Sequence, residues 1–268
     1  MSGYRDNVPA ISAVVCPHPP LLVPAMAGLA ARELAELRAD CERAIDGLWA
    51  SAPDLIAVIG AGRQTLVCES SAIGSFAGYG LPLSVRLGGG AAADSAAPTL
   101  PLSLTVGAWL LRDRPSSPPR IGQSVSAAAS AAECVALGAS IANRAARVGL
   151  LVMGDGSACH GEKSPGYADE RAPAFDAGVV DALERVDVDA LLALDPAVAD
   201  QLLAAGRPAW QVLAGAVAAS GGDWVGSVPY VAAPYGVGYV VAEWRRTDAA
   251  AGETPADVAA GEPCAEAA

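Results

Sequence analysis

The sequence predicts an α/β protein, a single domain with a mainly parallel central sheet flanked by helices. Three short runs of β-branched and aliphatic residues, at 11–16, 55–59 and 148–153, are typical of buried strands. Residues 29–49, between the first two runs, carry apolar side chains at helical spacing and charged side chains on the opposite face. A strand, a helix and a second strand in this order form the unit from which parallel sheets are built.

The later part of the chain continues the alternation of helix and strand. Asp195 is expected to cap a helix whose first position is Pro196. Residues 61–130 give no clear order of elements, and residues 102–111 fit a helix and a strand equally well. Helices are expected at 128–144, 174–185, 195–203 and 208–219, and two late strands at 225–231 and 238–244.

The chain divides into a short leader, one domain and a tail. Residues 1–9 are polar and charged, which is unlike a signal peptide, and residues 10–246 form the domain. Residues 247–268 are rich in Ala, Gly, Glu and Pro, and we expect a disordered acidic tail. The longest uncharged stretch, residues 95–111, is short and broken by prolines, so no membrane span is expected and the cytoplasm is the predicted location.

The charge and cysteine content of the chain indicate which kinds of binding partner and which redox state to expect. The formal net charge of −12, with a single lysine, argues against a nucleic-acid or anionic-membrane binder. The six cysteines form no Cys-x-x-Cys pair, so we expect reduced and mostly buried thiols.

The two histidines of the chain each follow a predicted strand. His18 stands among prolines that fix the backbone, and His160 ends the run Gly154-Asp-Gly-Ser-Ala-Cys-His. Histidine is the common metal ligand and proton carrier near neutral pH, and loops at strand ends often hold the chemistry of α/β proteins. On the residues alone, a metal-binding or basic role for His18 and a structural role in a proline turn are equally supported. Asp155 is suited to orient an imidazole or to cap a helix.

The two histidine loops together resemble the B-type subunits of the class III extradiol ring-cleavage dioxygenase superfamily, which includes protocatechuate 4,5-dioxygenase β-subunits and Memo-like proteins. The resemblance rests on Pro-His-Pro-Pro after the first strand, on Gly-Asp-x-Ser-x-x-His before Phe175-Asp176, and on the late Pro234-Tyr-Gly-Val-Gly-Tyr stretch. It implies the fold of the extradiol dioxygenase B-type subunits and Fe(II) as cofactor. It also implies that His18 is an iron ligand, and that His160, with Asp155, is the catalytic acid and base.

The same alignment shows where the chain departs from the superfamily. The second metal ligand, a histidine after the second strand, falls on Gly62, and the third, a Glu or Cys near a late helix, falls on Ala205. Neither residue can bind a metal through its side chain. The resemblance therefore predicts a degenerate iron site that has lost Fe(II), in a small-molecule-binding or non-oxidative protein. A small aromatic molecule is the expected partner. Members of the superfamily often associate, so the resemblance also implies a homodimer.

Two alternatives stay open on the sequence. The first is an active Fe(II) dioxygenase that opens a catecholic ring with replacement ligands from Glu69, Asp155 or Glu243. The second is a Memo-like interaction protein, for which His18 and His160 are dispensable.

Overall fold

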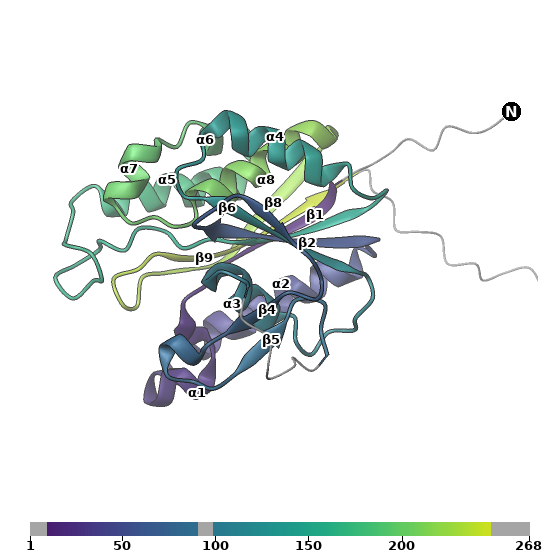
Figure 1. The fold of residues 1–268 in the computed structure, drawn as a ribbon. Helices are drawn as coiled ribbons and strands as arrows, with labels where there is room; N and C mark the ends of the chain where they lie inside the picture. Colours follow the sequence, from purple (N-terminus) through teal and green to yellow (C-terminus); the bar gives the residue numbers. More distant parts are fainter. Residues whose placement is uncertain (1–9, 91–98, 248–268) are drawn as a thin grey trace, which may run out of the picture.

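A computed structural model describes residues 10–90 and 99–247, and its central feature is a seven-stranded sheet (Figure 1). The strand order is β3-β6-β2-β7-β1-β9-β8. The four inner strands β6, β2, β7 and β1 are parallel, and β3, β9 and β8 are antiparallel to their neighbours. The fold is therefore the predicted α/β domain with a mainly parallel core. The strands are β1 Ala10–Cys16, β2 Leu55–Gly62, β3 Leu66–Cys68, β6 Arg120–Ser126, β7 Val148–Met153, β8 Trp224–Ala232 and β9 Tyr239–Arg246.

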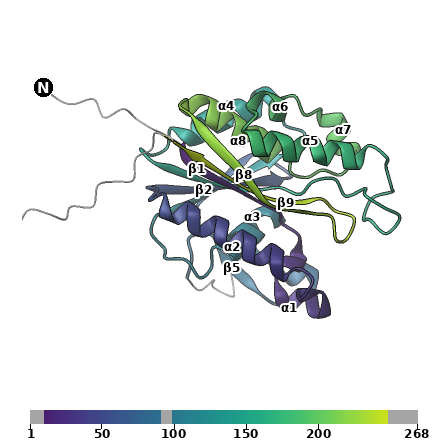
Figure 2. The ribbon, with the colours of Figure 1, turned by 180° about the vertical axis from the view of Figure 1, so that it is seen from behind.

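Helices cover both faces of the sheet (Figures 1 and 2). This explains why the inner strands β1, β2 and β7 are almost entirely apolar, since neither face of them meets water. One face carries α4 Ala131–Ala142, α5 Ala172–Arg185, α6 Val188–Leu192, α7 Pro196–Gln201 and α8 Arg207–Ser220. The other carries α1 Pro24–Ala27, α2 Ala35–Ala50, α3 Leu102–Leu110 and the small sheet of β4 Ile73–Ser75 and β5 Ser84–Arg86. Three short 3₁₀ turns occupy Pro20–Leu22, Gly28–Ala31 and Ala77–Tyr79.

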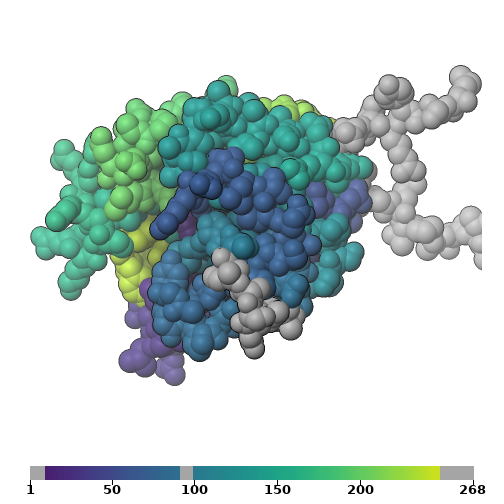
Figure 3. Space-filling model, in the orientation of Figure 1, coloured from purple at the N-terminus to yellow at the C-terminus, as the bar shows by residue number. Residues whose placement is uncertain are grey.

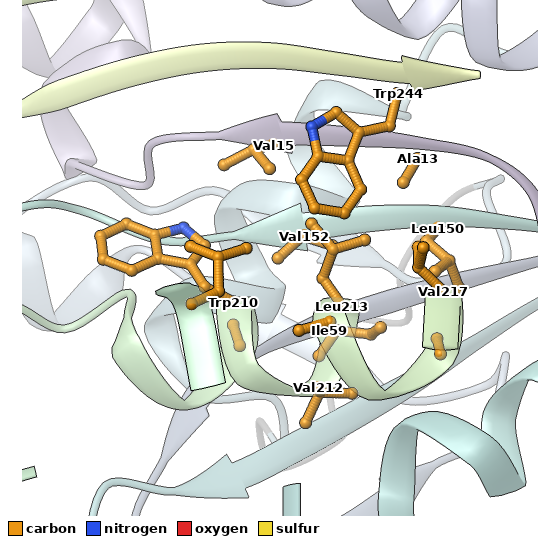
Figure 4. Packing of buried hydrophobic residues seen from close by; sticks show 14 of the residues in the cluster. Ala13, Val15, Ile59, Leu150, Val152, Trp210, Val212, Leu213, Val217 and Trp244 are labelled. Carbon is orange, nitrogen blue, oxygen red and sulfur yellow. The ribbon is translucent and has the colours of Figure 1, made fainter. Parts of the chain in front are cut away.

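Two tryptophans anchor the core between the sheet and the first helical layer (Figure 4). Trp210 projects from α8 toward the sheet, and Trp244 projects from β9. Trp244 is 1% exposed, and its Nε1–H donates to the carbonyl of Leu183 at 2.6 Å. Trp244 therefore ties the sheet to the end of α5.

The helices α4 and α8 approach each other at backbone distance. A Cβ at Gly138 of α4 would overlap the carbonyl oxygen of Val212, and one at Gly215 of α8 would lie 2.6 Å from the Cα of Val135. Glycine is required at both positions because no side chain fits between the two backbones.

The structure corrects two boundaries of the expected helices. The helix expected over 29–49 begins only at Ala35, because Gly28 has a φ of 53° and the following residues form a 3₁₀ turn. The helix expected over 128–144 begins at Ala131, where Ser130 and Glu133 form a capping box. Asp195 caps α7 as predicted, by accepting from the N–H groups of Ala197 and Val198.

Strand β6 is the main element that the sequence did not reveal. It begins with Arg120, which is buried because four backbone carbonyls accept from its guanidinium group. These bonds offset part of the cost of burying the charge, although Nε has no partner among the described residues. The arginine also breaks the apolar pattern by which strands are recognised. Within residues 102–111, which fitted either structure, Leu102–Leu110 form helix α3.

Strand β8 lies at one end of the sheet, and no other strand in the described ranges pairs with its outer edge. Its residues alternate between half-buried and exposed, and Pro229 lies on the exposed side. The pairing with β9 shifts register between Ser227 and Tyr230.

Several expectations concern the ends of the chain and its general character. The predicted leader at 1–9 and all of the predicted tail beyond Thr247 lie outside the described residues. The five cysteines within the described part are buried and free, as expected for reduced thiols. Within residues 10–90 and 99–247, no helix is both long enough and apolar enough to cross a bilayer.

Candidate functional site

The carboxyl ends of β1, β2 and β7 meet at one edge of the sheet, because the three strands are parallel neighbours. His18 follows β1, Gly62 ends β2, and the 154–160 loop follows β7. Figure 3 shows the segment near residue 25 in purple, the loop after β7 in teal-green and the β8–β9 hairpin in yellow along the same side of the molecule. This edge is where α/β proteins place their ligands.

His18 is held by Asp155. The backbone N–H of His18 donates to Asp155 Oδ1 at 2.7 Å, and the ring Nδ1 lies 3.6 Å from the same oxygen. The side chain is 8% exposed, and Nδ1 has no hydrogen-bond partner among the described residues. Burial raises the pKa of Asp155, and the neighbouring His18 opposes this rise in part. Asp155 thus binds the backbone of His18 and lies beside its imidazole, without a hydrogen bond to the ring.

His18 lines a broad cavity of about 1050 Å³ together with Gly62 and Ala205. These are the three positions that the superfamily alignment assigns to metal ligands, and they come from segments far apart in the chain. Ala205 stands two residues before the start of α8. The fold therefore brings together the three positions that the alignment selected, although only His18 carries a ligating side chain.

Ser124 occupies the space into which a side chain at position 62 would extend. A Cβ on Gly62 would overlap Ser124 Oγ, which donates to the carbonyl of Gln64 at 2.8 Å. The same arrangement recurs at Gly60, where a Cβ would lie 2.5 Å from Ser103 Oγ, the donor to Ala61 O. The end of β2 is therefore built around glycine and serine, and leaves no room for a ligating histidine.

The donor set of this cavity does not fit Fe(II) held by two histidines and a carboxylate. Among the described residues that line it, His18 is the single histidine, and neither a carboxylate nor a thiol is present. Arg63, an exposed residue, also lines the cavity and forms no ion pair with any described residue. A hard divalent cation needs oxygen or imidazole ligands, and a nearby guanidinium opposes its binding.

The three candidate replacement ligands are dispersed. Glu69 lines a different cavity, beside β3, and Glu243 lies at the middle of β9, where its Oε2 would be 3.3 Å from a Cβ on Gly47 of α2. Asp155 alone lies beside His18, on the side of Nδ1. Across residues 10–90 and 99–247, no three His, Cys, Asp or Glu side chains are grouped so as to hold a metal ion.

His160 forms a pair with a residue to which the sequence pattern assigned no role. Its Nε2 lies 2.6 Å from Oδ2 of Asp176, in the first turns of α5, and Asp176 Oδ1 accepts the N–H of Ser157 at 2.8 Å. Gly156 and Gly238 permit this approach, since a Cβ on either would collide with the carboxylate. Burial is the main cause that raises the pKa of Asp176, and its two hydrogen bonds lower it in part.

The 154–160 loop is bound to the β8–β9 hairpin through its backbone. The N–H of Gly156 donates to Gly238 O at 2.7 Å, that of Gly238 to Ser157 O at 2.8 Å, and that of His160 to Gly236 O at 3.2 Å. The thiol of Cys159 lies against the carbonyl of Leu202, 3.4 Å away. These bonds hold the loop in place, with Asp155 at one end beside His18 and His160 at the other end beside Asp176.

The two histidines line different cavities. His18 lines the cavity with Gly62 and Ala205, whereas His160 and Asp176 line a second cavity between α5 and the β8–β9 hairpin. The Phe175-Asp176 pair of the family pattern was the sequence signal for Asp176. Because Asp176 lies 16 residues after His160 in the chain, the sequence did not indicate that the two side chains are in contact.

Asp155→Asn is expected to stabilise the fold more at pH 6 than at pH 3.5. Because burial raises the folded-state pKa of Asp155, the folded protein holds this proton more tightly than the unfolded chain does. Stability is therefore lost as the pH rises above about 4, the ordinary pKa of an aspartate. Asparagine keeps an acceptor for the His18 N–H but does not titrate.

Urea unfolding at both pH values measures this effect, with the exposed Asp189→Asn as the matched control. An equal change in unfolding free energy at the two pH values would contradict the raised pKa.

Comparisons with known proteins add little to this geometry. No family model matches the chain, and no curated protein matches it in sequence. Among solved structures, it is similar to an uncharacterized protein, JW3007, from Escherichia coli K12, at 13% identity. The match covers 88% of this chain and 99% of that chain, with a TM-score of 0.48.

Proposed function

We propose that this chain is a metal-independent binding protein related to the B-type subunits of extradiol dioxygenases, with a degenerate iron site. Its ligand is a small aromatic molecule that carries a carboxylate or phenolate group, bound in the cytoplasm in the cavity of His18. The observation that supports this most is the convergence of His18, Gly62 and Ala205 on one cavity. That convergence supports the alignment, which places the two missing metal ligands at Gly62 and Ala205.

The charges in the cavity support an anionic ligand. Arg63 lies in its wall, and no described carboxylate lines it. The hydroxyl groups of Thr99 and Ser126 and the ring of His18 offer further polar contacts. A planar guanidinium group recognises carboxylates through paired hydrogen bonds.

The size and the remaining lining support an organic ligand. A cavity of about 1050 Å³ accommodates an aromatic ring with its substituents, and apolar side chains such as Leu66, Leu100 and Leu102 line it. His160 is absent from this lining, so the proposal gives it no part in binding here.

Isothermal titration with 4-hydroxybenzoate tests the ligand class, with 4-hydroxybenzyl alcohol as the neutral analogue. We expect the carboxylate to bind about tenfold more tightly than the alcohol, because an ionised hydrogen bond is worth roughly 1.4 kcal/mol more than a neutral one. Arg63→Ala is expected to abolish this preference. Arg144→Ala removes an exposed arginine outside the cavity and is the matched control.

Anaerobic titration of the metal-free protein with Fe(II) and Zn(II) tests metal independence. We expect no stoichiometric site beyond that of His18→Ala. A tight equimolar site that disappears in His18→Ala would overturn the proposal, as would equal affinity of folded wild-type protein for the carboxylate and the alcohol.

A further inference from the structure

We propose that the chain has a second binding site, the cavity beside His160, and that this site takes a hydrophobic organic ammonium ion. The proposal does not depend on the function assigned to the His18 cavity, because the two cavities share no lining residue.

The second cavity is a partly open cleft between α5 and the β8–β9 hairpin, and has a volume of about 500 Å³. Every residue of its wall lies within the described part of the chain. This volume suits a ligand of the size of a substituted benzene ring with a short side chain. Its walls are mostly apolar, formed by Pro173, Ala177, Val179, Val180, Val231 and Val240.

The charged groups that line this cavity are all acidic, apart from the His160 imidazole itself. Asp176 is partly buried beside His160, and Asp181 and Glu184 are exposed on α5. Asp181 pairs with Arg185 at the surface, whereas Glu184 forms no ion pair among the described residues. Neither lysine nor arginine is among the described lining residues, so the cavity favours a cation over an anion.

The pair of His160 and Asp176 offers a specific place for an ammonium group. The Nε2 atom of His160 faces Asp176, and Nδ1 has no hydrogen-bond partner among the described residues. When the proton is on Nε2, Nδ1 is a free acceptor. An ammonium group can therefore donate to Nδ1 while its charge is balanced by the partly buried carboxylate of Asp176.

Two aromatic residues complete the site. Tyr239 and Trp210 both line the cavity, and each is at least nine-tenths buried. Burial raises the pKa of Tyr239, so its phenol stays neutral and its ring can attract a cation. The indole Nε1–H of Trp210 is buried without an acceptor in the described residues.

Three isosteric probes test the charge preference by isothermal titration. These are 3-phenylpropylammonium, 3-phenylpropan-1-ol and 3-phenylpropanoate. We expect the ammonium ion to bind about tenfold more tightly than the alcohol, and the carboxylate not to bind.

Two variants with matched controls locate the site. Asp176→Asn keeps the shape and removes the charge, and is expected to abolish the preference for the ammonium ion, whereas Asp189→Asn, outside the cavity, leaves it unchanged. Val180→Trp fills the cavity and is expected to prevent binding of every probe. Val225→Trp adds the same side chain at an exposed position of β8 and controls for general effects.

Each outcome bears on the proposal. Binding of the ammonium ion that is lost in Asp176→Asn and in Val180→Trp supports it. Equal binding of the three probes, or binding unaffected by Val180→Trp, overturns it. It is also overturned if no ammonium binds and the chain instead forms a dimer that Val180→Trp disrupts. Binding of 4-hydroxybenzoate reports on the His18 cavity alone. Its retention or loss therefore separates failure of the ammonium site from failure of the function proposed for the His18 cavity.

Discussion

The triple variant Gly62→His, Ser124→Ala, Ala205→Glu is expected to bind one Zn(II) or Fe(II) per chain at least about a hundredfold more tightly than the present chain. His18, Gly62 and Ala205 line one cavity, so the three new or retained side chains would face the same space. Two imidazoles and a carboxylate form the facial set that such metals prefer.

Ser124→Ala is part of the design because Ser124 Oγ blocks a Cβ at position 62. Alanine removes that oxygen and costs the hydrogen bond to Gln64 O. The lost bond is expected to lower stability by about 1 kcal/mol.

Anaerobic metal titration with spectroscopic detection measures this gain, and Ser124→Ala alone is the control. A folded triple variant that binds no more metal than Ser124→Ala would show that side chains at positions 18, 62 and 205 cannot bind one metal ion together. In that case the resemblance to the extradiol superfamily would lose its main support.

Trp244→Ala is expected to lower the free energy of unfolding by about 3–5 kcal/mol. Its side chain is 1% exposed, packs in the core between the sheet and α4, α5 and α8, and donates to Leu183 O (Figure 4). Its removal leaves a cavity and a buried carbonyl without a donor, and each of these costs free energy.

Urea unfolding measures this loss, with Trp224→Ala as the matched control. Trp224 lies on the edge strand β8, is partly exposed, and donates to the nearby Gly221 O. We expect a shift of the Trp224→Ala midpoint less than half that of Trp244→Ala, with similar slopes for both. Equal losses would contradict the anchoring role of Trp244.

The sequence predicted those parts of the fold whose signals are local. Strands β1, β2 and β7 are apolar on both faces because helices cover both sides of the sheet, and this produces an unbroken run of buried residues. The cap at Asp195 depends on residues two and three positions further on, which the sequence displays directly.

Strand β6 escaped prediction because its polar residues are satisfied by distant partners. Gln123 donates to Leu66 O and Ser124 to Gln64 O, both from the segment around β3. No local pattern reveals that a polar side chain is buried when its partner lies about sixty residues away along the chain.

In the candidate site, too, the sequence revealed the local features and not the contacts between distant segments. The sequence singled out His18, Asp155 and His160 from their loops, and the alignment placed Gly62 and Ala205 beside His18. It could not decide which imidazole Asp155 would contact, because that choice depends on how the 154–160 loop turns between β1 and the hairpin. The partner of His160 comes instead from α5, through a contact made only in the folded chain.

The form of β8 has a consequence for solubility. An exposed edge strand offers unpaired backbone groups to other chains, and it is a common starting point for aggregation. Pro229 has no amide hydrogen to offer, and the shift of register beside it interrupts the regular spacing that a second strand would need. Colliding copies also repel each other, since each carries a formal net charge of −12. Within residues 10–90 and 99–247 the sheet therefore ends at β8, and its growth from molecule to molecule is disfavoured.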